Sequence, residues 1–256
     1  MKLLIDAGNT RIKWALAEGK DLLCRGDLPT GQTGRLSRDI AEQLAHLNHM
    51  TSLHAIKQIW ASNVAGEEVA QQIRSIGAGI AVQPHFAVSR ESQCGVRNGY
   101  SRASQLGSDR WAALLSAWHL VQEQCLVVNS GTATTIDTLS GQGEFVGGLI
   151  LPGVELMQRS LVEATDQLKS TQGVYAPFPL NSADAIYSGS IQASCGAIER
   201  QYSLLDDDSA PLVLSGGTAV LLESYLNKKI FKVPPRVVDD LVLRGLLVMA
   251  QEADCC

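Results

Sequence analysis

The chain has 256 residues, of which 45% are hydrophobic and 18% charged, and its formal net charge is −5. This composition describes a globular protein and excludes a disordered one. The acidic balance argues against non-specific nucleic-acid binding, which usually needs a basic face. No apolar run approaches the roughly 18 residues of a membrane span, and no signal peptide is recognisable. The six scattered cysteines form no C-x-x-C pair, so we expect reduced thiols in a cytoplasmic protein.

The first segment predicts a strand, a turn and a second strand. Residues 3–5 are apolar and predict a buried strand that stops at Asp6. Gly8 and Asn9 suit the positive φ of a tight hairpin. Backbone N–H groups and the Thr10 hydroxyl in such a turn can hold phosphate, and Asp6 is suited to a hydrated Mg²⁺ beside it. An ordinary Asx-Gly hairpin is the alternative for one copy of the pattern.

The next segments predict the remainder of an α/β domain. Residues 21–27 can form a third strand, and residues 33–49 carry leucine and isoleucine at helical spacing. A strand over 56–61 and a helix over 66–76 follow. The predicted order is therefore three strands, a helix, a strand and a helix.

Residues 84–106 form the longest stretch without clear periodicity, and this stretch contains Tyr100. Loops of this length inside a compact domain are usually functional. The stretch leads into a helix whose first turn contains Asp109 and Arg110. An aspartate there can simply cap the helix. Beside an arginine, it can instead accept a hydroxyl proton while the guanidinium holds an anionic substrate, as phosphoryl transfer to a small hydroxy acid requires.

The second half repeats the first pattern. Residues 126–137 again give an apolar strand, a polar residue, a glycine turn and a strand, with Asn129 in the place of Asp6 and Gly131 in the place of Gly8. A third glycine turn, Gly216-Gly217, follows a strand over 211–215. Two phosphate hairpins and a late glycine turn are a far more specific signal than one hairpin. The other predicted elements are helices over 156–168, 183–204, 218–226 and 239–250 and a strand over 229–233.

This arrangement resembles the superfamily of sugar kinases, acetate kinase and actin-like ATPases, in which ATP lies in a cleft between two duplicated domains. The resemblance implies an α/β fold of two ribonuclease-H-like (actin-like ATPase) domains, each with a mixed five-stranded sheet flanked by helices. We place these domains at residues 1–120 and 121–256.

A narrower resemblance is to type III pantothenate kinase, and it spans nearly the whole chain. Its most discriminating motif is Gly-Ser-Asp-Arg before Trp. The family phosphorylates pantothenate with ATP to 4′-phosphopantothenate, the first step of coenzyme A synthesis, and works as a homodimer. The motifs that carry the resemblance are Asp6-Ala7-Gly8-Asn9-Thr10, Asn98-Gly99-Tyr100, Gly107-Ser108-Asp109-Arg110-Trp111, Gly131-Thr132-Ala133 and residues 147–153.

The resemblance implies a role for each matching residue. Asp109 is the base for the pantothenate hydroxyl. Substrate binding falls to Tyr100, Gly107, Ser108, Arg110 and, from the partner subunit, Ser182. Binding of ATP and its phosphates falls to Asp6, Gly8, Asn9, Thr10, Lys13, Gly131, Thr132, Gly216 and Gly217.

Asn129 departs from the family pattern. The family usually has an aspartate there, which helps to bind an activating monovalent cation such as K⁺ or NH₄⁺. An asparagine oxygen can coordinate a hard cation but supplies no negative charge. We therefore expect weaker dependence on K⁺ or NH₄⁺ than the family pattern implies, with ATP bound together with a Mg²⁺ that Asp6 holds through water.

Two other functions remain open at this point. The same fold serves ATP-hydrolysing phosphatases and switches, although the 98–100 motif and the Asp109–Arg110 pair argue against these. The protein could also be a non-catalytic accessory factor that acts through a protein partner. Its acidic balance makes direct DNA contact improbable.

Overall fold

The computed structural model describes residues 1–46, 53–164 and 172–255. These residues form two compact units, Met1–Ser116 with Leu241–Cys256 and Ala117–Asp240. Each unit contains a mixed sheet together with helices, which makes the protein α/β as expected. Among the described residues, no helix is long and apolar enough to cross a membrane.

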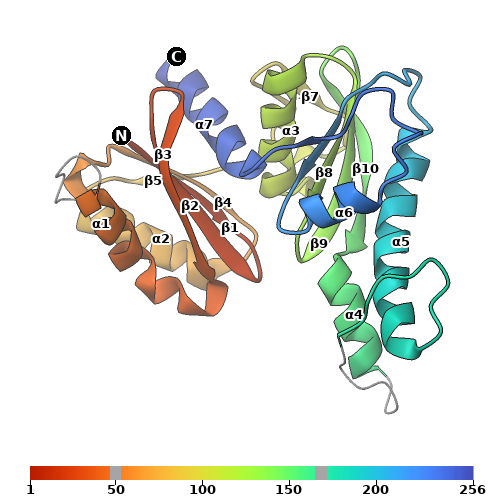
Figure 1. Cartoon of the computed structure of the whole chain (residues 1–256). Coiled ribbons are helices and arrows are strands. Elements are labelled where there is room, and N and C mark those ends of the chain that lie inside the picture. Colours follow the sequence, from red (N-terminus) through yellow and green to blue (C-terminus); the bar gives the residue numbers. More distant parts are fainter. Residues whose placement is uncertain (47–52, 165–171, 256) are drawn as a thin grey trace. The chain divides into compact units, whose positions relative to one another are not determined.

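The first unit is built on a mixed five-stranded sheet in the order β3-β2-β1-β4-β5 (Figure 1). The central strand β1 runs antiparallel to β2 and parallel to β4. The strands are β1 (Lys2–Ala7), β2 (Arg11–Glu18), β3 (Asp21–Pro29), β4 (Gln58–Asn63) and β5 (Pro84–Phe86).

The two faces of this sheet are covered by different helices, because alternate side chains of a strand point to opposite faces. Leu3 and Ile5 point into a core closed by α1 (Leu36–His46) and α2 (Glu67–Gly79). The opposite face, which carries Lys2, Leu4 and Asp6, packs against α7 (Leu241–Asp254). Asp6, the expected site residue of β1, therefore lies on the α7 face of the sheet.

The segment that showed no periodicity contains short elements. After β5 come the hairpin strands β6 (Ser92–Gln93) and β7 (Val96–Asn98) and a 3₁₀ turn, η3 (Ala103–Gln105). The helix α3 (Ser108–Val121) begins soon afterwards. Two further 3₁₀ segments flank α1 and are η1 (Thr30–Arg35) and η2 (Leu53–Ala55).

The second unit repeats the strand order of the first. Its sheet has seven strands in the order β12-β11-β8-β9-β10-β7-β6, so the expectation of five strands was wrong for this sheet. The strand β8 runs antiparallel to β9 and parallel to β11. Numbered from β1 and from β8, the strands β1–β5 and β8–β12 both follow the order 3-2-1-4-5, so the expected duplication is present, and β7 and β6 extend the second sheet beyond β10. The strands are β8 (Cys125–Ser130), β9 (Ala133–Leu139), β10 (Glu144–Pro152), β11 (Leu212–Ser215) and β12 (Arg236–Val237).

Helices of the second unit cover its sheet. These are α4 (Val154–Glu163), α5 (Ser182–Tyr202) and α6 (Ala219–Tyr225). Their apolar residues, including Ile191 and Leu222, share one core with Leu126 and Leu214 of the sheet. The end of the helix expected over 156–168 lies outside the described residues.

Two local expectations were wrong. Neither Gly8 nor Asn9 has a positive φ. Ala7 pairs with Ile12, so the connection is longer than a two-residue hairpin and does not need left-handed residues. The strand expected over 229–233 is absent, because Phe231 is buried in the core and pairing with β11 begins only at Arg236, beyond two prolines.

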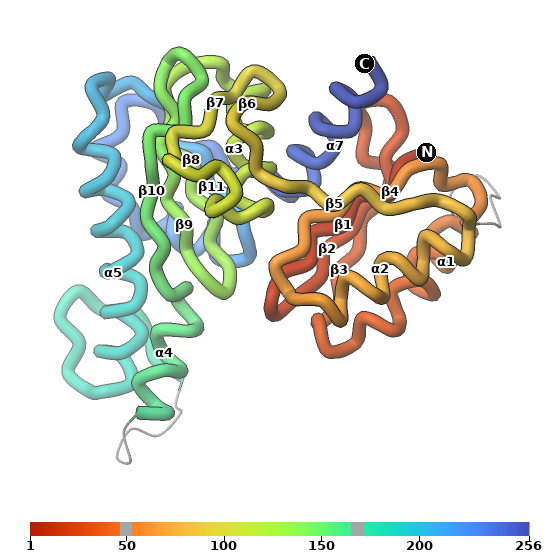
Figure 2. The backbone as a smooth tube through the Cα atoms, turned by 180° about the vertical axis from the view of Figure 1, so that it is seen from behind, coloured from red at the N-terminus to blue at the C-terminus, as the bar shows by residue number. Residues whose placement is uncertain are grey.

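The C-terminal helix is the main difference from the expected domain division. We placed residues 121–256 together, but α7 packs with the first unit. Its apolar residues, Leu243 and Leu246 among them, are buried. Its last turn is tied to the sheet where the Lys2 Nζ donates to Asp254 Oδ2 at 2.5 Å. The N- and C-terminal ends of the chain therefore lie side by side (Figure 2).

Candidate active site

The first phosphate hairpin places Asp6 and Lys13 opposite each other. They form one cross-strand pair of the β1–β2 ladder, so both side chains share one face of the sheet. The connection between the strands is closed by the Gly8 N–H, which donates to the Arg11 carbonyl at 3.0 Å. Asn9 and Thr10 are exposed at its tip. A carboxylate, a lysine and an exposed polar loop are thus gathered at one end of β1.

The end of β3 and the segment after it support this loop. The Thr30 hydroxyl donates to the Gly8 carbonyl at 2.7 Å, and the Thr30 N–H donates to the Thr10 carbonyl at 3.0 Å. Because both hydrogen bonds go to carbonyl groups of the loop, they fix its backbone. The loop N–H groups can then be presented to an anion without further ordering.

Ser62 connects the hairpin to α3. It is fully buried at the end of β4 and is paired in register with Asp6. Its Oγ lies 2.9 Å from the Oγ of Ser108, the first residue of α3. The expected phosphate residue Asp6 and the first turn of α3 are therefore brought together within the first unit.

The first turn of α3 presents Asp109. Its Oδ1 accepts the Arg110 N–H at 2.8 Å, which fixes the carboxylate against the helix. Gly107 leaves the space for this arrangement, since a Cβ there would lie 2.6 Å from the same Oδ1. The glycine of the motif is thus explained by the position of the carboxylate beside it.

Arg110 and Tyr100 contact each other. Arg110 is 6% exposed, its Nη1 donates to the Tyr100 hydroxyl at 3.2 Å, and its guanidinium carbon lies 5.8 Å from the centre of the tyrosine ring. The Tyr100 N–H in turn donates to Asn98 Oδ1 at 3.0 Å. A buried guanidinium held by an aromatic ring can recognise a carboxylate through two parallel hydrogen bonds.

A polar cavity adjoins Tyr100. Its volume is about 380 Å³, and mostly polar side chains line it. The lining residues are Glu91, Ser92, Arg97, Asn98, Tyr100, Ser101 and Ala103. A larger hollow of about 520 Å³ lies near Arg74 and Phe86 and contains none of the expected site residues.

The second phosphate hairpin has the same closed form as the first. The Gly131 N–H donates to the Ala133 carbonyl, and the Gly153 N–H donates to the Thr132 carbonyl, each at 2.9 Å. A Cβ on Gly153 would lie 2.0 Å from the Gly131 carbonyl oxygen. The start of α4 therefore packs backbone to backbone against the hairpin and leaves Gly131 and Thr132 exposed.

The late glycine turn lies beside that hairpin. Gly216 has a φ of +97°, and a Cβ on it would lie 2.2 Å from the Ser130 carbonyl oxygen. Thr218 follows, and its Oγ1 lies 2.6 Å from Ser130 Oγ. The residues expected to bind phosphate and adenosine in this unit, Gly131 and Gly216-Gly217, are thus brought together around Ser130.

The chain matches a family model over most of its length. The model for type III pantothenate kinase matches residues 2–204. The chain belongs to the type III pantothenate kinase family. It is 42% identical over 253 residues to the type III pantothenate kinase of Nitrosospira multiformis, covering 98% of this chain and 91% of that protein. It is also 42% identical to the enzyme of Aromatoleum aromaticum, covering 98% of both chains.

Solved structures with the same fold share little sequence with it. The ethanolamine utilization protein EutJ of Carboxydothermus hydrogenoformans superimposes with a TM-score of 0.57 at 13% identity, over 97% of this chain and 88% of that one. The activator of the 2-hydroxyisocaproyl-CoA dehydratase of Clostridium difficile, with bound ADPNP, gives 0.54 at 12% identity, over 98% and 93%. These likenesses support the actin-like ATPase fold. Membership of the pantothenate kinase family makes the protein an ATP-dependent kinase of coenzyme A synthesis.

Ser182 and Asn129 are the remaining residues that the sequence singled out. Ser182 is exposed at the start of α5, next to the cap in which Asn181 accepts the Asp184 N–H. Asn129 is half-buried at the end of β8, between Thr135 of β9 and Ser215 of β11. Its neighbours in the ladder are thus hydroxyl residues rather than carboxylates.

Ser62, Ser130 and Thr218 were missed by the sequence reasoning. Ser62 and Ser130 each stand at the carboxyl end of a parallel strand, where α/β proteins place ligands. Their position at the ends of predicted strands could have identified both residues from the sequence. Thr218 follows the glycine turn directly, but its hydroxyl contact with Ser130 spans 88 residues and has no local signature.

Proposed function

We propose that Asp109 is the general base for phosphorylation of pantothenate and that Arg110 binds the pantothenate carboxylate. The observation that supports this most is the first turn of α3, where a fixed carboxylate is followed by a buried guanidinium in contact with Tyr100. In the reaction the hydroxyl proton passes to the Asp109 carboxylate. The hydroxyl oxygen then bonds to the γ-phosphorus of ATP, and the bond from that phosphorus to ADP breaks.

We assign the other expected site residues by the charge, hydrogen-bond donors or backbone access that each can supply. Tyr100, Gly107 and Ser108 surround Asp109 and Arg110 and would complete pantothenate binding. Lys13, the loop N–H groups and the Thr10 hydroxyl supply positive charge and donors for ATP phosphates. In the second unit Gly131 and Thr132 would bind phosphate, and Gly216-Gly217 would allow a nucleoside to approach the backbone closely.

The residues around Asp6 fit a Mg²⁺ that reaches the site with ATP. The described residues contain no group of three or more His, Cys, Asp or Glu side chains that could hold a metal. Mg²⁺ is commonly bound through only one or two carboxylates, with water and substrate phosphates as its other ligands. Asp6 is such a carboxylate, and the ion would neutralise phosphate charge. Lys13, on the same face of the sheet, would add to that neutralisation.

The decisive test of this assignment is Asp109→Asn. We expect its turnover to fall by about 10² to 10⁴, the usual contribution of a general base. Pantothenate binding, measured calorimetrically, should persist because Arg110 and Tyr100 are retained. ADP release should depend on added pantothenate in the unchanged enzyme. Near-normal turnover in the variant would remove Asp109 from its role.

We further propose a homodimer in which Ser182 of one subunit completes the substrate site of the other. Support comes from large apolar side chains that are exposed around β10, α4 and the start of α5. Leu180, two residues before Ser182, is 98% exposed and Phe178 is 89% exposed. Exposed apolar groups of this size usually mark an interaction surface. The others are Val146, Leu149, Ile150, Leu161 and Val174.

Mixing two impaired variants would test the shared site. Asp109→Asn and Ser182→Ala are each expected to have low activity alone. After subunit exchange at equal amounts, a mixed dimer has one complete site if Ser182 acts across the interface. Activity should then recover to about a quarter of the unchanged enzyme, since about half of the dimers are mixed. No recovery, with exchange verified, would mean that Ser182 acts within its own subunit or not at all.

A further inference from the structure

The hairpin turn between β6 and β7 contains a cysteine, Cys94, which is an unusual residue for such a turn. Gln93 pairs with Val96, so Cys94 and Gly95 form a two-residue hairpin turn. Their φ angles are +50° and +80°. Two left-handed residues in succession are typical of a type I′ turn, which favours Asn-Gly, Asp-Gly or Gly-Gly. A cysteine is disfavoured there, so something outside the hairpin must hold the turn in this form.

Glu252 provides this support from outside the hairpin through a hydrogen bond. The Cys94 N–H donates to Glu252 Oε1 at 2.8 Å, across 158 residues of sequence. Burial and a hydrogen bond with the same carboxylate raise the pKa of the Cys94 thiol to about 12. The thiol is therefore protonated at neutral pH and adds no negative charge beside Glu252. One carboxylate on α7 thus binds the backbone N–H of the strained residue.

The hairpin is also attached to the helix that carries Asp109 and Arg110. Gln93 Oε1 accepts the indole N–H of Trp111 at 3.0 Å, and Trp111 is fully buried. On the other side of the turn, β7 ends at Asn98, whose Oδ1 accepts the Tyr100 N–H. The hairpin therefore connects the base-carrying helix to the tyrosine loop.

We propose that Glu252 is a positioning residue for pantothenate binding, acting through the Cys94–Gly95 turn. The inference rests on the proposed role of Tyr100 and Arg110 in binding pantothenate. Without Glu252, the left-handed conformation of Cys94 loses the backbone hydrogen bond that favours it. The turn then relaxes, β7 shifts, and Tyr100 no longer meets Arg110 in the geometry that binds the substrate.

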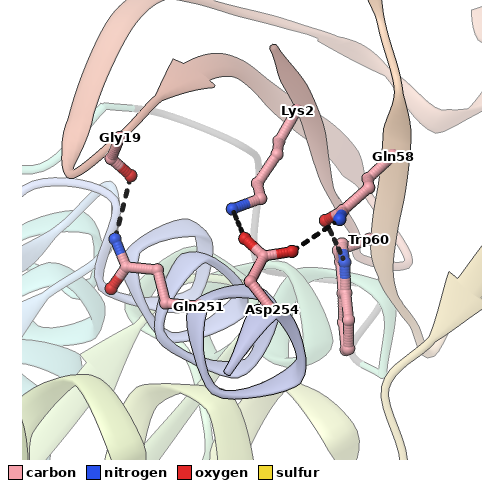
Figure 3. Close-up of polar contacts among 6 residues, drawn as sticks. All are labelled: Lys2, Gly19, Gln58, Trp60, Gln251 and Asp254. Atoms are coloured by element: carbon pink, nitrogen blue, oxygen red, sulfur yellow. Dashed lines mark hydrogen bonds and ion pairs between the residues drawn. The ribbon is translucent and has the colours of Figure 1, made fainter. Parts of the chain in front are cut away.

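Asp254, which lies with Glu252 in the last turn of the helix α7, provides a control. Asp254 Oδ2 accepts from Lys2 and its Oδ1 from Gln58, and the Gln251 side chain donates to the Gly19 carbonyl (Figure 3). These contacts attach α7 to the sheet and leave the hairpin untouched. Removing Asp254 therefore removes contacts of α7 without touching the Cys94–Gly95 turn.

The experiment compares Glu252→Ala, Glu252→Gln and Asp254→Ala in steady-state kinetics with each substrate varied. We expect Glu252→Ala to raise the KM for pantothenate about 3- to 10-fold, a part of what one charged hydrogen bond contributes. The KM for ATP should stay within about twofold. Glu252→Gln keeps an acceptor oxygen and should recover most of the loss. The inference is overturned if Glu252→Ala leaves the KM for pantothenate unchanged, or if Asp254→Ala raises it equally.

A second variant tests the route through the turn. Cys94→Asn creates the favoured Asn-Gly sequence, so the turn should need less support from Glu252. In the double variant Cys94→Asn/Glu252→Ala, we expect the KM for pantothenate to return to within about twofold of the unchanged enzyme. A double variant as impaired as Glu252→Ala would contradict the proposal. Thermal unfolding of each variant shows whether it is folded at the assay temperature.

The variant Tyr100→Phe distinguishes a failure of this inference from a failure of the proposed pantothenate site. If Tyr100→Phe leaves the KM for pantothenate unchanged, the assignment of Tyr100 to the substrate is wrong, and the inference fails with it. If Tyr100→Phe raises that KM and Glu252→Ala does not, the site stands and only the role of Glu252 is wrong.

Discussion

Gly107 lies against the carboxylate of Asp109, so closely that a Cβ on residue 107 would stand 2.6 Å from Asp109 Oδ1. The same oxygen accepts the Arg110 N–H. The glycine of the Gly-Ser-Asp-Arg motif is therefore required by the position of the Asp109 carboxylate and not by a left-handed backbone, since its φ is not positive.

Gly107→Ala should consequently reduce turnover without unfolding the protein. The added methyl group meets the end of a movable side chain, which can swing away and leave the reacting position. A displacement of about 1 Å can cost about 10²-fold in rate, and we expect a loss of this order. Gly79→Ala in α2 is the matched control, because a Cβ there meets nothing within 4 Å. A Gly107→Ala enzyme as active as Gly79→Ala would contradict this account of the motif.

Arg110→Lys should weaken pantothenate binding selectively. A lysine keeps the charge but loses the planar pair of donors and the guanidinium contacts with the ring and hydroxyl of Tyr100. We expect the KM for pantothenate to rise about 10- to 100-fold, with a much smaller change in the KM for ATP. An analogue without the carboxylate should be insensitive to the substitution. Equal effects on both substrates would indicate a structural arginine.

Asn129 should make the enzyme less dependent on monovalent cations than is usual in its family. Desolvating K⁺ opposite a neutral amide gains little compared with a carboxylate. Initial rates in Na⁺ should therefore approach those in K⁺ or NH₄⁺ at fixed ionic strength. Steep, saturable activation by K⁺ would disprove this. Asn129→Asp is the converse test and should strengthen the cation dependence.

The Lys2–Asp254 pair should make stability depend on pH in the acid range. Hydrogen bonds from Lys2 and then Gln58 hold the pKa of Asp254 below its ordinary value. A lowered pKa in the folded state stabilises the fold above the unfolded value, near pH 4, and this contribution is lost as the pH falls through the folded value. Asp254→Asn should therefore be less stable at pH 7, and the difference should shrink below about pH 4. A difference that stays constant over this range would exclude ionisation of Asp254 as its cause. The side chain is 43% exposed, so we expect a small effect.

Local patterns in the sequence determined much of this protein. A continuous apolar run located β1 and alternation of apolar residues located β2. The repeat of Asp6 and Gly8 as Asn129 and Gly131 indicated the duplication seen in the strand order of both sheets. The Asp109–Arg110 motif located the first turn of α3. These features are readable because neighbouring residues in a strand, turn or helix end interact with each other, so their spacing carries the information.

Contacts between distant segments were decided only by the tertiary structure. Nothing in the periodicity of residues 239–250 shows that α7 returns to β1, because an amphipathic helix can pack on any sheet that offers an apolar face. The Ser62–Ser108 and Ser130–Thr218 pairs join segments 46 and 88 residues apart. The Glu252–Cys94 hydrogen bond likewise depends on the tertiary structure. A glutamate in the exposed last turn of a helix gives no sequence signal, and its role depends on the left-handed Cys94 that the fold places beside it.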